Sequence, residues 1–320
     1  MALMVTCCSA CSKSPESPDA VGNKEDKVKV SERNLERAVI LIENAAKHYS
    51  KDGTTAFSMT YNPFSSKPSD NLVSVWEYTS SIEAVTAAMN SMKAFRDAGN
   101  STVYDSKYET FKSLLARLYA GLEYYKGTFE LTSYTGTATW SPYGVHRASS
   151  PGTAAVAGVE NVYDDQMWII RELINAWRAT GEAGYLERAE YLTAYVLDGW
   201  DCTLNASGKE NGGITWGPGY VTKHACSNSP MITPLVWLHE IYKGKSDEIT
   251  YGVINADNTR AKKTSKKADW YLEMAVKIYD WQKGCLLRSD GVYDDFMGGY
   301  KTGGGQPEYE TVNGAKYRKN

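Results

Sequence analysis

The chain of 320 residues contains 42% hydrophobic and 23% charged residues, which is ordinary for a globular protein with a sizeable core. This composition excludes disorder over most of the length. The formal net charge of -3 argues against a nucleic-acid partner, because surfaces that bind nucleic acid carry an excess of Lys and Arg.

The N-terminal stretch resembles a lipoprotein signal peptide. Residues 1–11 are mostly small or apolar and end in Ser9-Ala10-Cys11, which looks like a bacterial lipobox. Cys8 stands where the motif usually has Leu and no basic residue precedes it, so the signal is imperfect or truncated, and a short unstructured N-terminus is the alternative. A lipid on Cys11 predicts a location in the bacterial cell envelope, in the periplasm or at the cell surface.

Residues 12–30 are polar and predict a flexible linker before the domain of residues 31–320. No later segment approaches the ~20 apolar residues of a membrane span, so the lipid is the only membrane contact that we expect. Cys202, Cys226 and Cys285 are odd in number and fit no zinc spacing. A Cys202–Cys226 bridge stays open for an oxidising compartment. We expect no metal and no cofactor.

Seven segments carry apolar residues at three- and four-residue spacing and are separated by clusters of Gly, Asn, Ser and Pro. They predict helices over about residues 32–49, 73–95, 108–125, 163–179, 185–200, 228–242 and 266–286. Ser31 is the expected N-cap of the first helix, and the Thr180-Gly181 break predicts a helical hairpin. Residues 243–267 are expected to form a charged surface loop.

An all-α helical toroid explains this pattern best, because short turns alternate with long loops. In a toroid, the inner helices can carry such long loops to one open end of the ring. A solenoid of helix pairs gives the same local pattern. Against a simple solenoid, the sequence shows no repeat of fixed period, and its long loops contain Gly, aromatic and acidic residues.

The adjacent carboxylates Asp164 and Asp165 are the strongest candidates for chemistry. Asp164 shares a helix face with Trp168, four residues on. Capping and the helix dipole favour Asp at a helix start in any case. Two adjacent acids also repel each other and separate their proton affinities, and glycoside hydrolysis needs one ionised and one protonated carboxyl group. The carboxyl groups of two neighbouring residues can lie ~5 to 5.5 Å apart, which is the separation found in retaining glycosidases.

A glycine-rich stretch over residues 212–228 is a candidate wall for a binding site. It carries Trp216, Tyr220, Lys223 and Asn228, and its glycines permit close approach of the backbone to a ligand. A plain surface loop is the simpler interpretation. The stretch lacks the residue order of a phosphate-binding loop. Tyr is abundant and Trp outnumbers Phe, with 23 Tyr, 9 Trp and 6 Phe, and rings that carry a polar group suit sugar surfaces as well as cores.

Several of these motifs together resemble glycoside hydrolase family 76, over roughly residues 30–300. The matching residues are Tyr163-Asp164-Asp165 with Trp168, Gly199 to Asp201, Gly212-Gly213-Ile214 to Trp216, and Lys223, Ser227 and Asn228. The resemblance implies an (α/α)6 barrel, a retaining mechanism and α-mannan as the substrate. It makes Asp164 the nucleophile and Asp165 the general acid/base.

The candidate sugar-binding side chains are Tyr163, Trp168, Trp76, Trp216, Tyr220, Lys223 and Asn228. The resemblance implies all of them except Tyr220, which is a candidate from the glycine-rich stretch. Trp76 and Glu77 match more weakly. Tyr293-Asp294-Asp295 looks like another loop of the family, but we do not assign it the catalytic pair. An (α/α)6 barrel has twelve helices, so about seven helices predict a toroid that is incomplete at the C-terminus.

Three functions remain as hypotheses. The first is an endo-α-1,6-mannanase that hydrolyses the α-mannan backbone, and the second is a non-catalytic helical glycan-binding lipoprotein of a polysaccharide-uptake system. The third is a transglycosidase on the same scaffold. The paired acids separate the first from the second, because a binding protein needs no carboxyl pair with split proton affinities.

Overall fold

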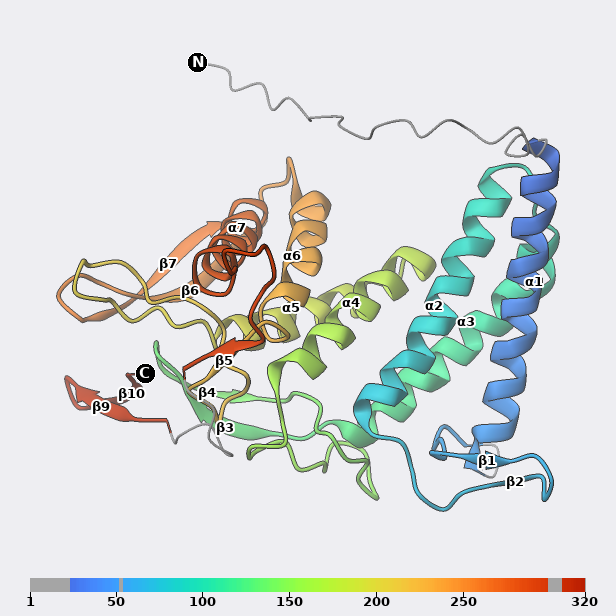
Figure 1. Ribbon diagram of the computed structural model, residues 1–320, viewed down its shortest axis with the longest axis horizontal. Helices are drawn as coiled ribbons and strands as arrows, with labels where there is room; N and C mark the ends of the chain where they lie inside the picture. The colour runs from blue at the N-terminus through green and yellow to red at the C-terminus, as the bar shows by residue number, and fades with distance from the viewer. Residues whose placement is uncertain (1–23, 52–53, 299–306, 320) are drawn as a thin grey trace.

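The computed structural model describes residues 24–51, 54–298 and 307–319 of the chain (Figure 1). The predicted signal peptide, including Cys11, and the start of the predicted linker lie outside the described residues. Within them, the helices are α1 (Lys24–Tyr49), α2 (Val75–Asp97), α3 (Thr102–Leu122), α4 (Tyr163–Thr180), α5 (Ala183–Leu197), α6 (Ser229–Tyr242) and α7 (Lys267–Cys285). All seven predicted helices are therefore present.

The start of α1 differs from the prediction. The helix begins at Lys24, so the last part of the predicted linker is helical. Ser31 is not an N-cap. It lies inside α1, because the helix already includes the charged residues before it. Its hydroxyl donates to the carbonyl of Lys27 at 3.0 Å.

The helices after α1 form three hairpins, α2–α3, α4–α5 and α6–α7, and the members of each hairpin pack against each other. α2, α4 and α6 are also neighbours in a row, with α2 against α4 and α4 against α6, while α1 packs on α2 at one end (Figure 1). α3, α5 and α7 thus form an outer layer on this row. The helical fold class is confirmed, and a closed toroid stays a prediction.

Local signals in the sequence set the ends of these helices. Ser74 and Glu77 form a capping box at the start of α2. Gly181 ends α4 with a φ of 77°, a left-handed conformation that favours glycine, and its N–H donates to the carbonyl of Trp177 at 2.7 Å. The predicted α4–α5 hairpin is confirmed.

One apolar core runs through all seven helices. Each helix contributes buried side chains at helical spacing, among them Val39, Ile82, Leu115, Ile170, Leu192, Leu235 and Ile278. Buried tyrosines link the layers, since the hydroxyl of Tyr78 donates to the carbonyl of Leu118 at 2.9 Å and that of Tyr108 to the carbonyl of Ala179 at 2.6 Å. Packing in the core therefore holds the helix row together.

Five pairs of short antiparallel strands decorate the described helices. They are β1 (Tyr61–Asn62) with β2 (Lys67–Pro68), β3 (Phe129–Thr132) with β4 (Thr137–Trp140), β5 (Lys223–His224) with β8 (Phe296–Met297), β6 (Glu248–Ile254) with β7 (Arg260–Lys266), and β9 (Tyr309–Val312) with β10 (Ala315–Arg318). The loop predicted over residues 243–267 is wrong, because β6 and β7 form a regular hairpin there. Ile249 and Tyr251 pack against the core at alternate positions of β6, as one face of a strand requires.

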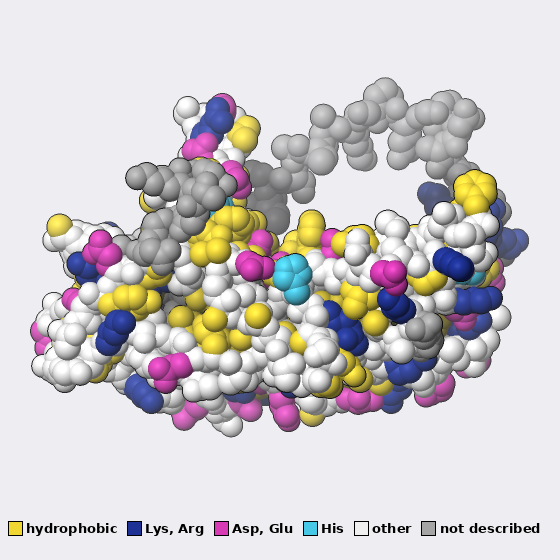
Figure 2. All heavy atoms as spheres, turned by 90° about the horizontal axis from the view of Figure 1, so that it is seen from below, with side chains coloured by type: hydrophobic (Ala, Val, Ile, Leu, Met, Phe, Trp, Pro, Cys, Tyr) yellow, Lys and Arg dark blue, Asp and Glu magenta, His cyan; other side chains and the backbone are white. Residues whose placement is uncertain are grey.

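No helix among the described residues is long and apolar enough to cross a membrane. Seen from below Figure 1, the surface mixes hydrophobic and charged side chains, and Lys and Arg are most frequent toward the α1 end (Figure 2). Cys202, Cys226 and Cys285 are free thiols, so the structure contains no Cys202–Cys226 bridge.

Candidate active site

The paired acids lie in the first turn of α4, and neither of them is its N-cap. Val162 occupies the N-cap position and makes no side-chain capping bond. Asp164 and Asp165 follow Tyr163 as the second and third helical residues, and both side chains are half-buried. The positive end of the helix dipole favours their charge, but the need for a cap does not explain two acids here.

Asp164 lies against the glycine-rich stretch. Within the described part of the chain, its Oδ1 atom and the Nε1 atom of Trp216 are both buried without a hydrogen bond. Burial raises the pKa of Asp164, whereas the first-turn backbone amides, the Cys226 thiol and the Trp216 indole oppose this rise. Asp164 is thus desolvated, but it has several groups nearby that favour its ionised form.

In the part of the chain that the structure describes, no hydrogen-bonding group comparable to those around Asp164 favours the ionised form of Asp165. Burial, the neighbouring charge of Asp164 and the charge of Glu77 together raise the pKa of Asp165 to about 7. Glu77 is held at the start of α2, where its carboxylate accepts from the backbone N–H of Ser74 at 2.8 Å. The two acids therefore differ in environment, and Asp165 is the one that holds a proton near neutral pH.

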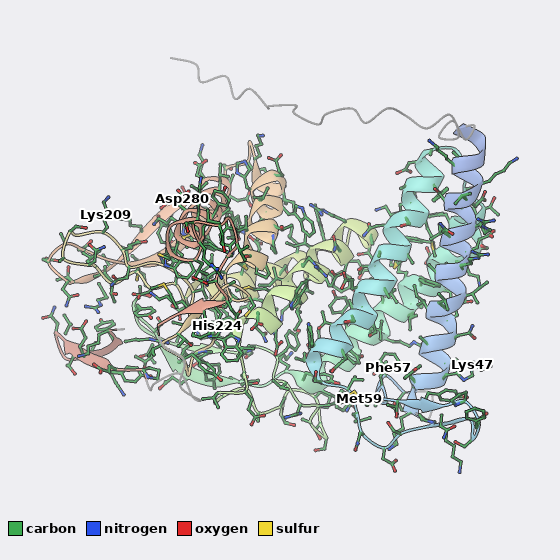
Figure 3. The ribbon with its side chains drawn as sticks, viewed as in Figure 1. Lys47, Phe57, Met59, Lys209, His224 and Asp280 are labelled. Carbon is green, nitrogen blue, oxygen red and sulfur yellow. The ribbon has the colours of Figure 1, made fainter. Side chains whose placement is uncertain are left out.

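Trp216 is fixed over the start of α4 by its backbone and by its ring. Its carbonyl accepts from the N–H of Tyr163 at 2.8 Å. Its ring stacks on His224, with centroids 4.5 Å apart, and contacts Tyr220 at 4.7 Å. Phe296 of β8 also stacks on His224, with ring centroids 5.1 Å apart. Figure 3 labels His224 beside the β5 ribbon. This ring stack holds the indole N–H toward Asp164.

Asn228 and Lys223 have partners within the protein. The Asn228 side chain, fully buried, accepts from the N–H of Ile214 at 2.8 Å and donates to the carbonyls of Ile214 and His224. Lys223 Nζ lies 2.7 Å from Asp201 Oδ2 and donates to the carbonyl of Gly212 at 2.6 Å. In this structure both residues brace the glycine-rich stretch.

Glycine is required in this stretch by conformation and by space. Gly213 has a φ of 80°, and a Cβ there would lie 2.4 Å from the Trp281 ring. Gly212 likewise has a positive φ, of 75°. The glycines therefore serve close packing against tryptophan rings.

Tyr163 and Tyr220, two other predicted sugar contacts, are buried. Tyr163 packs on Tyr195 and on Gly199, where a Cβ would lie 2.5 Å from the Tyr163 ring. Trp76 is the opposite case, because 59% of it is exposed beside Glu77 at the start of α2. Among the predicted aromatic contacts, the exposed Trp76 and the half-buried Trp168 and Trp216 are those with accessible surface.

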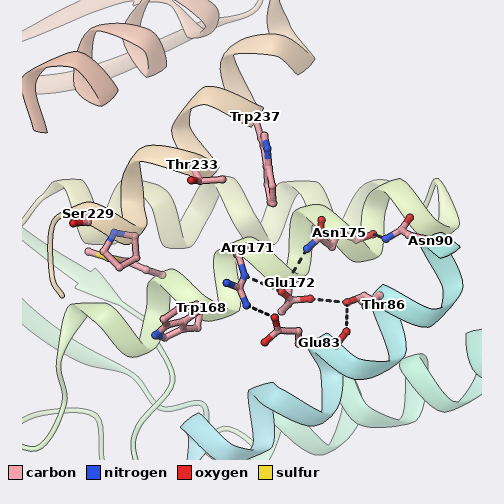
Figure 4. A pocket seen from close by; sticks show the side chains of 13 residues that line it. Glu83, Thr86, Asn90, Trp168, Arg171, Glu172, Asn175, Ser229, Thr233 and Trp237 are labelled. Atoms are coloured by element: carbon pink, nitrogen blue, oxygen red, sulfur yellow. Dashed lines mark hydrogen bonds and ion pairs between the residues drawn. The ribbon is translucent and has the colours of Figure 1, made fainter. Parts of the chain in front are cut away.

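Trp168 lines a groove of about 610 Å³ that opens one turn beyond the acid pair (Figure 4). Side chains of α2, α4 and α6 form its walls, including Glu83 from α2, Arg171 from α4 and Trp237 from α6. Arg171 lies 2.7 Å from Glu83 and 3.0 Å from Glu172, and these pairs are drawn as dashed lines in Figure 4. The sequence prediction missed this groove, although polar residues at helical spacing on otherwise apolar helices are its signal.

The sequence prediction also did not place Asp295, His224 and Cys226 near the acid pair. Asp295 reaches this region because β8 pairs with β5, and its carbonyl accepts from the N–H of Ala225 at 2.7 Å. Burial lowers the pKa of His224, and the charge of Asp295 opposes this effect. Burial and the charge of Asp164 raise the pKa of Cys226 to about 12, so the thiol stays protonated.

Among the described residues, no cluster of His, Cys, Asp or Glu is suited to hold a metal ion.

Solved structures of glycoside hydrolase family 76 share this fold. A family 76 mannosidase from Bacteroides thetaiotaomicron VPI-5482 is 19% identical, with a TM-score of 0.55, and the match covers 82% of this chain and 57% of that one. A family 76 hydrolase from a bovine B. thetaiotaomicron strain gives 21% identity, a TM-score of 0.56 and coverage of 84% and 46%. A family 76 α-mannanase from B. thetaiotaomicron is 17% identical, with a TM-score of 0.53, and the match covers 83% of this chain and 57% of that one.

These likenesses confirm the predicted resemblance at the level of the fold, which is what identities of 17–21% establish. The chain spans about half the length of the structures that it matches. No family model and no curated protein sequence matches it.

Proposed function

We propose that the chain is a retaining glycoside hydrolase of α-mannan, an endo-α-1,6-mannanase, with Asp164 as nucleophile and Asp165 as general acid/base. The observation that carries this proposal is the environment of the acid pair. The pKa of Asp165 is raised to about 7; burial raises the pKa of Asp164 as well, but amides, a thiol and an indole oppose this rise and favour its charge. A retaining glycosidase needs one protonated and one ionised carboxyl group.

The proposed reaction has two steps. Asp165 gives its proton to the glycosidic oxygen while an oxygen of Asp164 forms a bond to the anomeric carbon, and the leaving sugar departs with that proton. Asp165, now a carboxylate, takes a proton from water, and the water oxygen displaces Asp164 from the anomeric carbon. Asp165 ends protonated and Asp164 ends ionised, as both began. No cofactor takes part in this scheme.

The test is release of reducing ends from linear α-1,6-mannan by the native chain and by Asp164→Asn and Asp165→Asn. We expect each substitution to remove most of the turnover while the helical circular dichroism is retained. Asp294→Asn is the matched control, because Asp294 belongs to another adjacent acid pair, is exposed, and lies 3.9 Å from Arg288. Full activity in both Asp164→Asn and Asp165→Asn contradicts the assignment.

A non-catalytic glycan-binding protein is the second candidate, and the groove beside Trp168 and Trp237 favours it. Such a protein binds α-mannan oligosaccharides with both acids neutralised and releases no reducing ends. A binding titration of the Asp164→Asn, Asp165→Asn double variant, set beside the activity of the native chain, separates the two functions.

The cell-envelope location is part of the proposal. It depends on the lipobox-like Ser9-Ala10-Cys11 sequence. Expression of the chain and of Cys11→Ser in a bacterium, followed by membrane fractionation and mass spectrometry of the N-terminus, tests it. We expect a lipid on Cys11 and loss of the membrane-bound fraction in Cys11→Ser, and an unlipidated native chain contradicts this location.

A further inference from the structure

Two tryptophans line the groove, and an arginine is placed against each. The guanidinium carbon of Arg171 lies 4.3 Å from the centroid of Trp168, and that of Arg178 lies 4.2 Å from the centroid of Trp237. Both arginines belong to α4 and are seven residues apart, so they share one helix face. Each guanidinium covers one face of its indole and fixes the orientation of the ring.

The groove contains charged side chains that pair with one another. Arg171 lies between Glu83 and Glu172, and the Thr86 hydroxyl donates to Glu172 Oε2 at 2.5 Å. An apolar helix laid over these side chains would desolvate their charges without offering them hydrogen bonds. The groove therefore fits a ligand that has both apolar faces and many hydroxyl groups.

A sugar chain has this chemistry, because each ring has C–H faces that pack on an indole and hydroxyls that bond carboxylates and amides. Asn175 and Glu83 supply such polar groups beside the two rings, and Figure 4 shows Trp237 extending from α6 toward α4. Asp164 and Asn175 are 11 residues apart on α4, a rise of about 16 Å. The groove thus begins one turn beyond the acid pair and extends along α4 away from it.

We propose that this groove is a glycan-binding site distinct from the acid pair, in which Trp168 and Trp237 bind successive parts of one oligosaccharide. The choice of an α-1,6-linked mannose chain as its ligand rests on the proposed function. Because the groove lies beyond the acid pair, only a longer oligosaccharide bound at the acid pair reaches it. The groove therefore adds little to the binding of a disaccharide.

The experiment is a calorimetric titration of the full chain carrying Asp165→Asn with α-1,6-linked mannobiose and mannotetraose. We expect the tetraose to bind more tightly, and Trp237→Ala to raise its Kd about tenfold while that of the biose changes little. Tyr279→Ala is the matched control and leaves both values unchanged, because Tyr279 is a half-exposed ring on α7 near Lys283 that lies outside the groove.

Arg178→Met is the second variant, since it keeps the indole and removes the cation that orients it. We expect a Kd for the tetraose raised about threefold, and this variant decides the question if Trp237→Ala does not fold. An unchanged tetraose Kd, or an equal loss for biose and tetraose, overturns the groove site even where the native chain hydrolyses mannan. Tetraose binding that depends on Trp237, in a chain that releases no reducing ends, supports the groove and overturns the proposed hydrolysis.

Discussion

The proton affinities of two adjacent residues are separated by what surrounds each side chain. Burial raises the pKa of both acids, but the indole of Trp216 and the thiol of Cys226 oppose the rise at Asp164, whereas two negative charges add to it at Asp165. The acid pair itself could be predicted from the sequence, because adjacent acids at a helix start are visible there. Their neighbours could not, since Glu77 and Cys226 come from segments far from α4 in the chain.

The raised pKa of Asp165 predicts the alkaline limb of the pH profile. A general acid must be protonated, so kcat/KM on α-1,6-mannan is expected to be high below about pH 7 and to fall as the pH rises through the pKa of Asp165. Glu77→Gln removes one negative charge and can keep the capping box, so it should move this limb to lower pH. A limb that stays in place in Glu77→Gln contradicts this origin.

The same pKa predicts an effect on stability. A carboxyl group whose pKa is raised by folding favours folding below its unfolded pKa of 3.8, and this advantage is lost as the pH rises toward about 7. Asp165→Asn should therefore stabilise the fold at pH 8, on the order of 1 kcal/mol, with little effect at pH 4. Urea unfolding of both chains at the two pH values measures this difference, and equal stability at pH 8 counts against the assignment.

Trp216 is expected to position Asp164 through its indole N–H. Trp216→Phe preserves a ring for the stack on His224 but removes that N–H, so the pKa of Asp164 should rise and the acidic limb of kcat should move to higher pH. We expect a loss in kcat of about tenfold or more with a smaller change in KM. Trp140→Phe is the matched control, because its indole N–H is also buried without a hydrogen bond, beside Asp198.

At the scale of elements, periodicity determined what could be predicted. The helices have apolar residues at three- and four-residue spacing over 14 to 26 residues, which is a strong signal. The strands β5 and β8 have two residues each and pair across more than 70 positions, so no local pattern predicts them. This pairing nevertheless brings Asp295 to His224, and the sequence prediction missed it.

The turn between α4 and α5 offers a clean test of helix termination. Gly181→Ala places a Cβ on a residue with a φ of 77° and should cost about 1 kcal/mol in the free energy of unfolding. Gly184→Ala is the matched control, because Gly184 lies in α5, has an ordinary φ and has open space around it, so alanine should be neutral or stabilising there. Chemical denaturation of both variants measures the contrast, and equal stability of the two contradicts it.

At the scale of the whole molecule, the three helix hairpins place α2, α4 and α6 side by side and so create both the acid pair's surroundings and the groove. The sequence predicted the hairpin α4–α5 from its short turn, but it could not say which helices become neighbours in the row. A groove that depends on three helices from residues 75 to 242 is a property of their packing. The solved family 76 structures agree with this fold and leave the chemistry to experiment.

The central claim is that Asp164 and Asp165 act as a retaining pair on α-mannan. The most direct measurement is a proton NMR time course of the native chain acting on linear α-1,6-mannan, which observes the anomeric signals of new reducing ends before mutarotation. We expect the first signals to be those of the α-anomer, as double displacement through Asp164 requires. First products in the β-anomer, or no products at all, would contradict the claim.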